Sequence, residues 1–178
     1  MKIGNFIKEI AMMAPNKVTL GVILVGIATL SACQWFGSSS HHEHKPSLVV
    51  VNVLDKQYYD DAHIAGSINV PLEELENYVQ KNLGKDTEIV IYCGNYKCLA
   101  SSEGAKMLTD LGYNHVWAYE GGTAEWKQLG FPINGAGKEV YLNDLEKPEG
   151  MTHEGVNMIT AQELKEKIEK HAQKRDCC

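Results

Sequence analysis

Arginine is almost absent from this chain of 178 residues, in which Arg175 is the only one. The formal net charge is −6, and the sequence contains no cluster or stripe of basic residues. Proteins that bind nucleic acids need such clusters to neutralise phosphates. The composition therefore argues against a nucleic-acid partner and indicates a hydrated, acidic surface.

Cysteine is too scarce for a disulfide scaffold, and no apolar run is long enough to span a membrane easily. The longest uncharged run, residues 18–32, has 15 residues, whereas a spanning helix needs about 20. The chain is long enough to bury a core of ordinary size without cross-links. The five cysteines are Cys33, Cys93, Cys98, Cys177 and Cys178.

Residues 1–32 have the pattern of a secretory signal, with lysines first and the apolar run of residues 18–32 next. The run ends in Leu-Ser-Ala-Cys at residues 30–33, which resembles the lipobox of bacterial lipoproteins. The resemblance implies a cleaved signal peptide, lipidation of Cys33 and a lipid-anchored protein of the bacterial cell envelope. Gln34 implies the outer membrane, facing the periplasm, if the host is Gram-negative. The alternative is an uncleaved signal anchor.

Residues 33–46 are expected to form a flexible tether, because they are rich in serine and histidine. The histidines of this segment could bind a transition metal weakly, but a solvated linker is the simpler interpretation. We therefore predict no metal site. The histidines concerned are His41, His42 and His44.

After the tether, apolar runs of strand length alternate with segments of helical periodicity. Residues 48–53 form a continuous apolar run, the pattern of a parallel strand buried on both faces. Such alternation predicts an α/β fold with three layers, in which helices cover both faces of a central parallel sheet. We expect strands over residues 48–53, 88–92 and 115–119, and helices over residues 72–83, 102–111 and around Trp126.

Cys93 directly follows the expected strand 88–92, at the end of the sheet where α/β folds place their sites. The following helix would direct backbone N–H groups and its positive end at the thiol, which favours the thiolate. We therefore interpret Cys93 as a nucleophile; the alternative is a buried small hydrophobe. The loop after it contains Gly94, Asn95, Tyr96, Lys97, Cys98, Leu99, Ala100 and Ser101.

Three separated stretches of residues 47–134 resemble the rhodanese family. Asn-Val-Leu at residues 52–54, followed by HIAGSINVP at residues 63–71, resembles the family's D-V-R and G-H-I-x-G-A-x-N-I-P. Tyr92-Cys93 resembles the active-site loop, and GGTAEWKQLGFP at residues 121–132 resembles the closing G-G-x-x-x-W-x-x-x-G-x-P. The resemblance implies a sulfurtransferase that forms a persulfide on Cys93, takes sulfur from a small donor and passes it to a thiol, small or on a protein. It implies no cofactor.

Two departures from the family pattern concern activity. The acid and the arginine of D-V-R are replaced by Asn52 and Leu54, and the loop is longer than the usual C-x4-R-S. Cys98 stands at the fifth place after Cys93, so that an oxyanion would find only Lys97 and backbone N–H groups. The missing arginine also disfavours the phosphatase branch of the fold, which needs C-x5-R.

Cys98 leaves three functions open. It could be the second thiol of a thiol–disulfide redox protein, or attack a persulfide on Cys93 and release hydrosulfide. It could also be a residue that replaced the arginine by drift. The hypotheses are therefore an envelope-anchored sulfurtransferase, a redox protein that uses Cys93 and Cys98, and a catalytically silent module that binds a partner.

Residues 135–156 are expected to form an exposed connecting loop, and residues 157–178 a short strand and a helix. Thr160 and Glu163 form a capping-box pattern, and an apolar stripe continues from it. Rhodanese domains usually begin with such an element, which is missing before residue 48. We expect this segment to pack on the domain in place of that element; the alternative is a helix that dangles or binds a partner. No chemistry is assigned to the terminal pair of cysteines.

Overall fold

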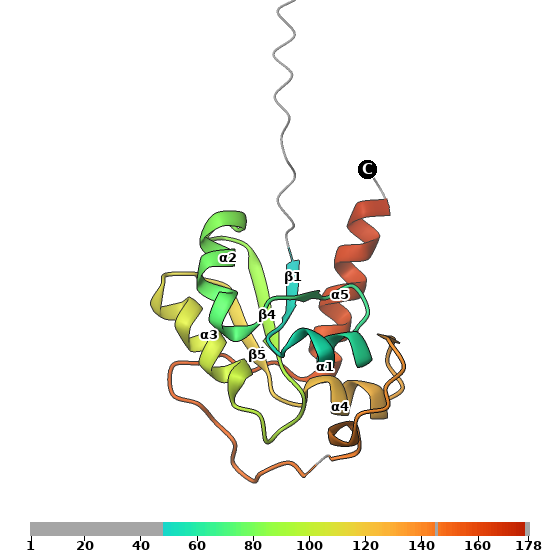
Figure 1. The fold of residues 1–178 in the computed structure, drawn as a ribbon. Coiled ribbons are helices and arrows are strands. Elements are labelled where there is room, and N and C mark those ends of the chain that lie inside the picture. Colours follow the sequence, from blue (N-terminus) through green and yellow to red (C-terminus); the bar gives the residue numbers. More distant parts are fainter. Residues whose placement is uncertain (1–47, 145, 177–178) are drawn as a thin grey trace, which may run out of the picture. The chain divides into compact units, whose positions relative to one another are not determined.

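The computed structural model describes residues 48–144 and 146–176 (Figure 1). The expected signal peptide, the lipidation site Cys33, the histidines of the tether and the last two cysteines lie outside these residues. The predictions made for them therefore stay predictions.

A parallel sheet forms the centre of the described domain, with the strand order β3-β1-β4-β5. In its register Val50 lies opposite Val90, which in turn lies opposite Trp117. The apolar runs in the two middle strands follow from this position, because both faces of a parallel sheet are covered. The strands are β1 (Leu48–Asn52), β3 (Ile68–Asn69), β4 (Glu88–Tyr92) and β5 (Val116–Tyr119); a small antiparallel sheet pairs β2 (His63–Ile64) with β6 (Ile133–Asn134).

Helices cover both faces of the central sheet, which confirms the predicted α/β class and its three layers (Figure 1). One face carries α2 (Leu75–Asn82), which follows the 3₁₀ turn η1 (Leu72–Glu74), and α3 (Ala100–Asp110). The other face carries α4 (Gly122–Gln128) and α5 (Ala161–Asp176).

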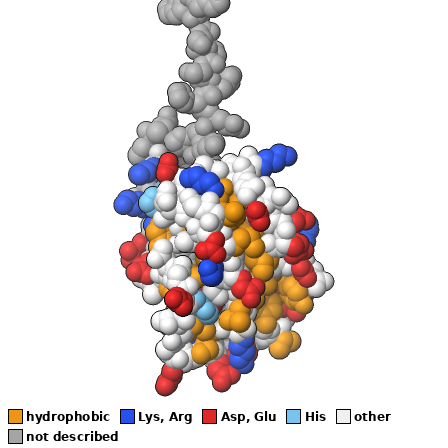
Figure 2. Space-filling view, turned by 90° about the vertical axis from the view of Figure 1, so that its left-hand side faces the viewer, with side chains coloured by type: hydrophobic (Ala, Val, Ile, Leu, Met, Phe, Trp, Pro, Cys, Tyr) orange, Lys and Arg blue, Asp and Glu red, His pale blue; other side chains and the backbone are white. Residues whose placement is uncertain are grey.

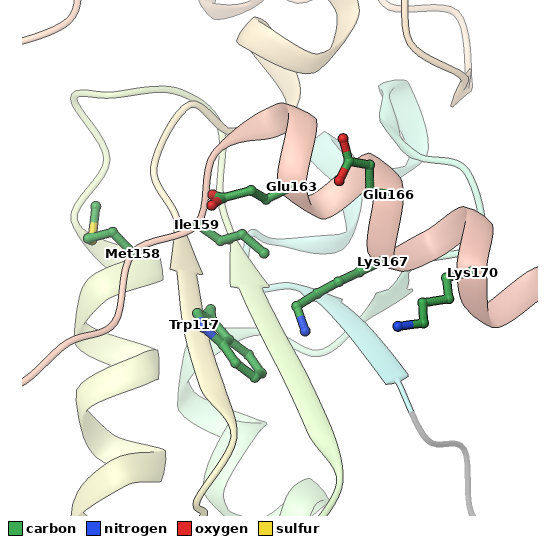
Figure 3. Close-up of a pocket in the computed structure, with 7 residues that line it drawn as sticks. All are labelled: Trp117, Met158, Ile159, Glu163, Glu166, Lys167 and Lys170. Atoms are coloured by element: carbon green, nitrogen blue, oxygen red, sulfur yellow. The ribbon is translucent and has the colours of Figure 1, made fainter.

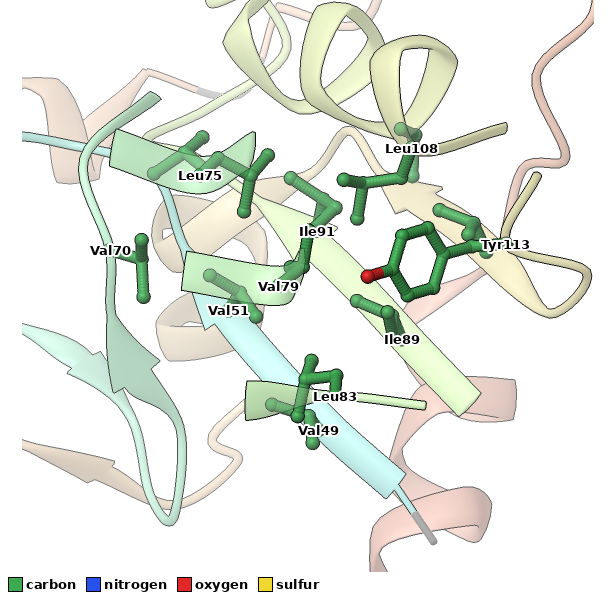
Figure 4. Close-up of a cluster of buried hydrophobic side chains, with 14 of the residues drawn as sticks. Val49, Val51, Val70, Leu75, Val79, Leu83, Ile89, Ile91, Leu108 and Tyr113 are labelled. Atoms are coloured by element: carbon green, nitrogen blue, oxygen red, sulfur yellow. The ribbon is translucent and has the colours of Figure 1, made fainter. Parts of the chain in front are cut away.

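Two hydrophobic cores separate the three layers, since successive side chains of a strand point to opposite faces. Val49 and Val51 of β1 face α2 and α3, where Leu75 and Leu108 pack on them (Figure 4). Val50, between these two valines, faces the opposite way. It belongs to the second core, with Tyr92, Trp126, Ile159 and Leu164.

The surface over α2 and α3 has hydrophobic side chains interspersed with charges of both signs (Figure 2). A shallow hollow there is lined by Glu76, Glu103, Lys106, Met107, Asp110 and Leu111. Within the described ranges, none of the helices combines the length and the hydropathy that crossing a bilayer requires.

Two connections differ from what the sequence predicts. The polar stretch after β1 contains a short helix, α1 (Lys56–Asp61), which has no buried residue and therefore no apolar periodicity to reveal it. The connection over residues 135–156 is not simply exposed, because it contains the 3₁₀ turn η2 (Val140–Asn143). Leu142 of this turn is 0% exposed, so part of the connection packs as core.

Residues 157–164 pack against the edge of the sheet beside β5. Met158 forms a parallel bridge with Ala118, whose N–H donates to the carbonyl of Asn157 over 2.8 Å. The capping box is formed: the N–H of Thr160 donates to Glu163 Oε2 over 2.9 Å, and the N–H of Glu163 donates to Thr160 Oγ1 over 3.3 Å. That the segment replaces a missing N-terminal element stays a prediction.

Candidate active site

Cys93 follows β4 directly and lies between the sheet and the start of α3. Its side chain is 0% exposed. The sulfur lies 3.1 Å from the carbonyl oxygen of Cys98, 3.9 Å from that of Asn95 and 3.4 Å from Ser101 Oγ. The N–H of Ser101, in the first turn of α3, also donates to it. The Cys93 thiol is therefore enclosed by hydrogen-bonding groups of its own loop.

Cys98 is half-buried, and both it and Cys93 are free thiols. The Cys93 thiol and the N–H groups of Ala100 and Gly94 donate to the Cys98 sulfur, and they lower its pKa to about 6. The same thiol–thiol hydrogen bond, followed by burial, raises the pKa of Cys93 well above its usual value. The hydrogen bond between the two thiols therefore makes Cys98 the more acidic of the pair and Cys93 the less acidic.

The glycine pair at residues 121–122 holds the loop against α4. The N–H of Thr123 donates to the carbonyl of Cys93 over 3.1 Å, and the N–H of Ala124 donates to that of Gly94 over 2.9 Å. Gly122 has a φ of +59°, and a Cβ there would lie 2.5 Å from the Cys93 carbonyl oxygen. Only glycine permits this close approach of two backbones.

The connection after β6 covers the other side of the loop. Lys97 pairs with Asp144 at 2.8 Å and Glu146 at 2.9 Å, and these carboxylates raise the pKa of Lys97 to about 12. The side-chain amide of Asn95 donates to the carbonyl of Tyr141 over 3.3 Å. The one loop cation proposed for an oxyanion is therefore already engaged by two carboxylates.

The remaining loop residues have structural contacts. The Tyr96 hydroxyl donates to Glu125 Oε1 over 2.6 Å, which fixes the middle of the loop to α4. Leu99 is 53% exposed and precedes Ala100, the first residue of α3. The helix thus begins two residues before the predicted residue 102, and the loop is correspondingly shorter.

Near Cys93 lies a buried carboxyl group, that of Glu120, which the sequence did not indicate. Ser101 Oγ donates to Glu120 Oε1 over 3.0 Å, and Glu120 is 2% exposed at the end of β5. Its other oxygen, Oε2, lies 3.9 Å from His153 Nε2. Burial raises the pKa of this carboxyl. Glu120 could have been noticed because it follows β5, at the sheet end where Cys93 follows β4; nothing in the sequence indicated His153.

The family model for the rhodanese-like domain matches residues 39–129, which is half of the chain. The chain belongs to the rhodanese-like domain family. The rhodanese-like domain is 29% identical over 83 residues to the thiosulfate sulfurtransferase GlpE of Coxiella burnetii, which covers 47% of this chain and 75% of that protein. It is 30% identical over 100 residues to the thiosulfate:glutathione sulfurtransferase of Saccharomyces cerevisiae, which covers 49% of this chain and 70% of that protein.

A solved rhodanese-like domain from Anabaena sp. is 30% identical, covers 51% of this chain and 89% of its own, and has a TM-score of 0.47. The family model and the relatives named as sulfurtransferases agree with the motifs that the sequence carries.

Two further features of the described residues bear on other possible sites. Among the residues that the structure describes, no group of histidine, cysteine and carboxylate side chains could hold a metal ion. An open groove lies where α5 meets the end of the sheet, and its side chains come from β5, α5 and the segment between them (Figure 3). Cys93 does not line this groove, whose residues are Trp117, Met158, Ile159, Glu163, Glu166, Lys167 and Lys170.

Proposed function

We propose that this rhodanese-like domain is a sulfurtransferase that carries sulfur as a persulfide on Cys93. The observation that carries the proposal is the position of the Cys93 sulfur, at the end of β4 and within hydrogen-bonding reach of the first turn of α3. Relatives named as sulfurtransferases support it. Helix N-termini stabilise the anionic sulfur that such a reaction needs.

The reaction has two steps, each a displacement at sulfur. The Cys93 thiolate attacks the sulfane sulfur of a donor such as thiosulfate; the donor's S–S bond breaks, and sulfite leaves with its electron pair. A second thiolate then attacks the outer sulfur of the Cys93 persulfide, and Cys93 leaves as thiolate. Because Cys93 is 0% exposed, both reactants require a shift of the loop or of the connection that covers it.

The hydrogen bond between the two thiols favours a second candidate, a thiol–disulfide reaction of Cys93 and Cys98. The Cys98 thiolate would attack Cys93 in its persulfide form, form a disulfide and release hydrosulfide. A thiol-containing reductant would then restore both thiols.

Intact-mass measurement of the purified protein, before and after treatment with thiosulfate, separates these functions. Sulfur transfer adds the mass of one sulfur atom, which Cys93→Ser abolishes and the matched variant Cys98→Ser retains. A loss of two hydrogens that Cys98→Ser prevents and a reductant reverses supports the redox reaction. An unchanged mass under every treatment contradicts both and favours a catalytically silent binding module.

We also propose that Cys33 is lipidated and anchors the domain in the bacterial cell envelope, on the side facing the periplasm if the host is Gram-negative. The support is the lipobox-like sequence at residues 30–33 after a basic and an apolar segment. Labelling cells with a radioactive fatty acid should label the protein but not its Cys33→Ser variant; equal labelling of the two would contradict the proposal.

A further inference from the structure

A series of polar side chains leads from Cys93 towards the surface, with hydrogen bonds as far as Glu120 and a gap of 3.9 Å from there to His153. The Cys93 sulfur lies 3.4 Å from Ser101 Oγ, which donates to Glu120 Oε1 over 3.0 Å. Glu120 Oε2 lies 3.9 Å from His153 Nε2, and the His153 side chain is 26% exposed. Neither of these last two atoms has a hydrogen-bond partner among the described residues, although both are buried.

An unpartnered carboxylate oxygen at a site that is 2% exposed is costly and calls for a function. Building on the proposed sulfur transfer, we propose that Ser101 and Glu120 take the proton from Cys93, and that His153 passes it to solvent. Glu120 then acts as the general base of the first step, through the hydroxyl of Ser101.

The burial of Cys93 explains why such a path is needed. With 0% of its side chain exposed, Cys93 cannot give its proton directly to water, and the carbonyl groups of Asn95 and Cys98 can hold that proton but not remove it. Ser101 provides both a contact to the sulfur and a contact to a carboxylate. A carboxyl whose pKa is raised by burial is also a stronger base at neutral pH than an exposed one.

The proton and electron balance is simple. The Cys93 proton moves to Ser101 Oγ while the Ser101 proton moves to Glu120 Oε1, which leaves a thiolate and a neutral carboxylic acid. The thiolate attacks the donor's sulfane sulfur, and the broken S–S bond leaves its electron pair on the donor's remainder. A rotation of the Glu120 carboxyl group then turns its protonated oxygen from Ser101 to His153, through which the proton reaches solvent; no external oxidant or reductant is involved.

The titratable groups that face Glu120 come from two segments. They are His153 in the connection and Cys98 and Tyr96 in the active-site loop; the charge of Glu120 is a minor upward contribution to the pKa of Cys98, which is lowered overall, and to that of Tyr96, which burial raises. Cys98 is a competing acceptor for the Cys93 proton, because the two thiols are hydrogen-bonded. His153 lies outside residues 39–129, so the outer end of the path comes from chain that the family model does not match.

The test measures single-turnover sulfur uptake from thiosulfate by Cys93, quantified by peptide mass, over a range of pH. It uses the Cys98→Ser protein as parent, because this removes the competing acceptor. In that parent, Glu120→Gln keeps an acceptor for the Ser101 hydroxyl but removes the base. We expect uptake to slow by about 100-fold at neutral pH, and the deficit to shrink as pH rises and the thiol ionises without help. The matched control Glu103→Gln removes an exposed carboxylate of the first turn of α3 and should keep the parent's profile.

A loss that is equal at every pH, or no loss at all, would overturn the proton path. Ser101→Ala gives an independent test with a small change of volume: it should show the same pH-dependent deficit, and a pH-independent one would contradict the path. Failure of the proposed function is distinguishable, because then neither the unsubstituted protein nor the parent gains sulfur at any pH.

Discussion

At the scale of single residues, the two cysteines of the site differ in position, in exposure and in pKa. Cys93 has the position that the family resemblance assigns to the nucleophile, yet it is buried and its pKa is raised by its hydrogen bond to Cys98 and by burial. Cys98 is half-exposed and its pKa is lowered to about 6, chiefly by the same hydrogen bond. The more accessible and the more acidic thiol is therefore Cys98, which stands beside the expected nucleophile.

This division predicts the order of alkylation by iodoacetamide. Cys98 should react faster than Cys93 at neutral pH, with its half-maximal rate near its pKa of about 6, as read by peptide mass. Cys93→Ala removes the main hydrogen-bond donor, so the pKa of Cys98 should rise towards its ordinary value of 9.0. Faster alkylation of Cys93, or a Cys98 profile that Cys93→Ala leaves in place, would contradict this assignment.

The position of Cys93 could be predicted from the sequence, but the pKa values of the two thiols could not. An apolar strand that ends in Cys93 before a helix is enough to place the thiol at the sheet end, because this depends on spacing alone. The pKa values depend on which carbonyl and N–H groups the loop turns towards each sulfur, and no spacing rule gives that. Glu120 and His153 meet only through the tertiary fold, since 33 residues separate them along the chain.

At the scale of elements, the start of α4 supports the loop through close backbone contact. Gly122→Ala should lower the free energy of unfolding by more than about 2 kcal/mol, because a Cβ would meet the Cys93 carbonyl oxygen at 2.5 Å in a left-handed conformation. Gly130→Ala is the matched control: its φ is +73°, but nothing lies within 4 Å of a Cβ there. Gly130→Ala should lower the free energy of unfolding by about 1 kcal/mol. Chemical denaturation measures both variants. Equal losses of unfolding free energy would show that the close approach to the Cys93 carbonyl is unimportant.

The contact between α5 and β4 gives a pH dependence. Burial raises the pKa of Glu88, but the hydrogen bond and charge of Lys167 at 3.0 Å, together with His171 at 3.5 Å, outweigh it and lower the net pKa below 4.5. A lowered carboxyl pKa contributes stability above the unfolded pKa and loses it as pH falls through the folded one.

Glu88→Gln should therefore lower the free energy of unfolding near neutral pH by up to about 1 kcal/mol, given its partial exposure. The difference should vanish at a pH well below the folded pKa, where Glu88 is protonated in both states. Denaturation of the two proteins at both pH values measures it, with the exposed Glu149→Gln as control. A difference that persists in acid would assign the loss to packing instead of charge.

Elements that bury a regular apolar face were predictable, and the others were not. Strands β1 and β4 could be predicted from their continuous apolar runs, and helices α2 and α5 from apolar residues at helical spacing. Helix α1 buries no side chain, and η2 buries only Leu142, so neither leaves a periodic signal. For this reason the sequence predicts an exposed connection, whereas the structure packs that connection on the active-site loop.

At the scale of the whole molecule, the last helix is part of the domain core. Leu164 of α5 is 0% exposed and belongs to the core that includes Val50 and Tyr92. Leu164→Ala should lower the free energy of unfolding by about 2–5 kcal/mol, whereas the exposed Gln162→Ala should change it by less than about 0.5 kcal/mol. Chemical denaturation measures both. A loss no larger for Leu164 than for Gln162 would indicate that α5 is only loosely attached.

The position of β1 has a mechanical consequence. The chain enters the described domain at Leu48, and β1 lies between β3 and β4 in the middle of the sheet. A pull transmitted through the preceding residues would therefore act on an interior strand. To draw β1 out lengthwise, the force must shear its five paired residues from β4, and its pairing with β3, at the same moment. The domain would resist traction at this end far better than if the same residues led into an edge strand that could be peeled away one bond at a time.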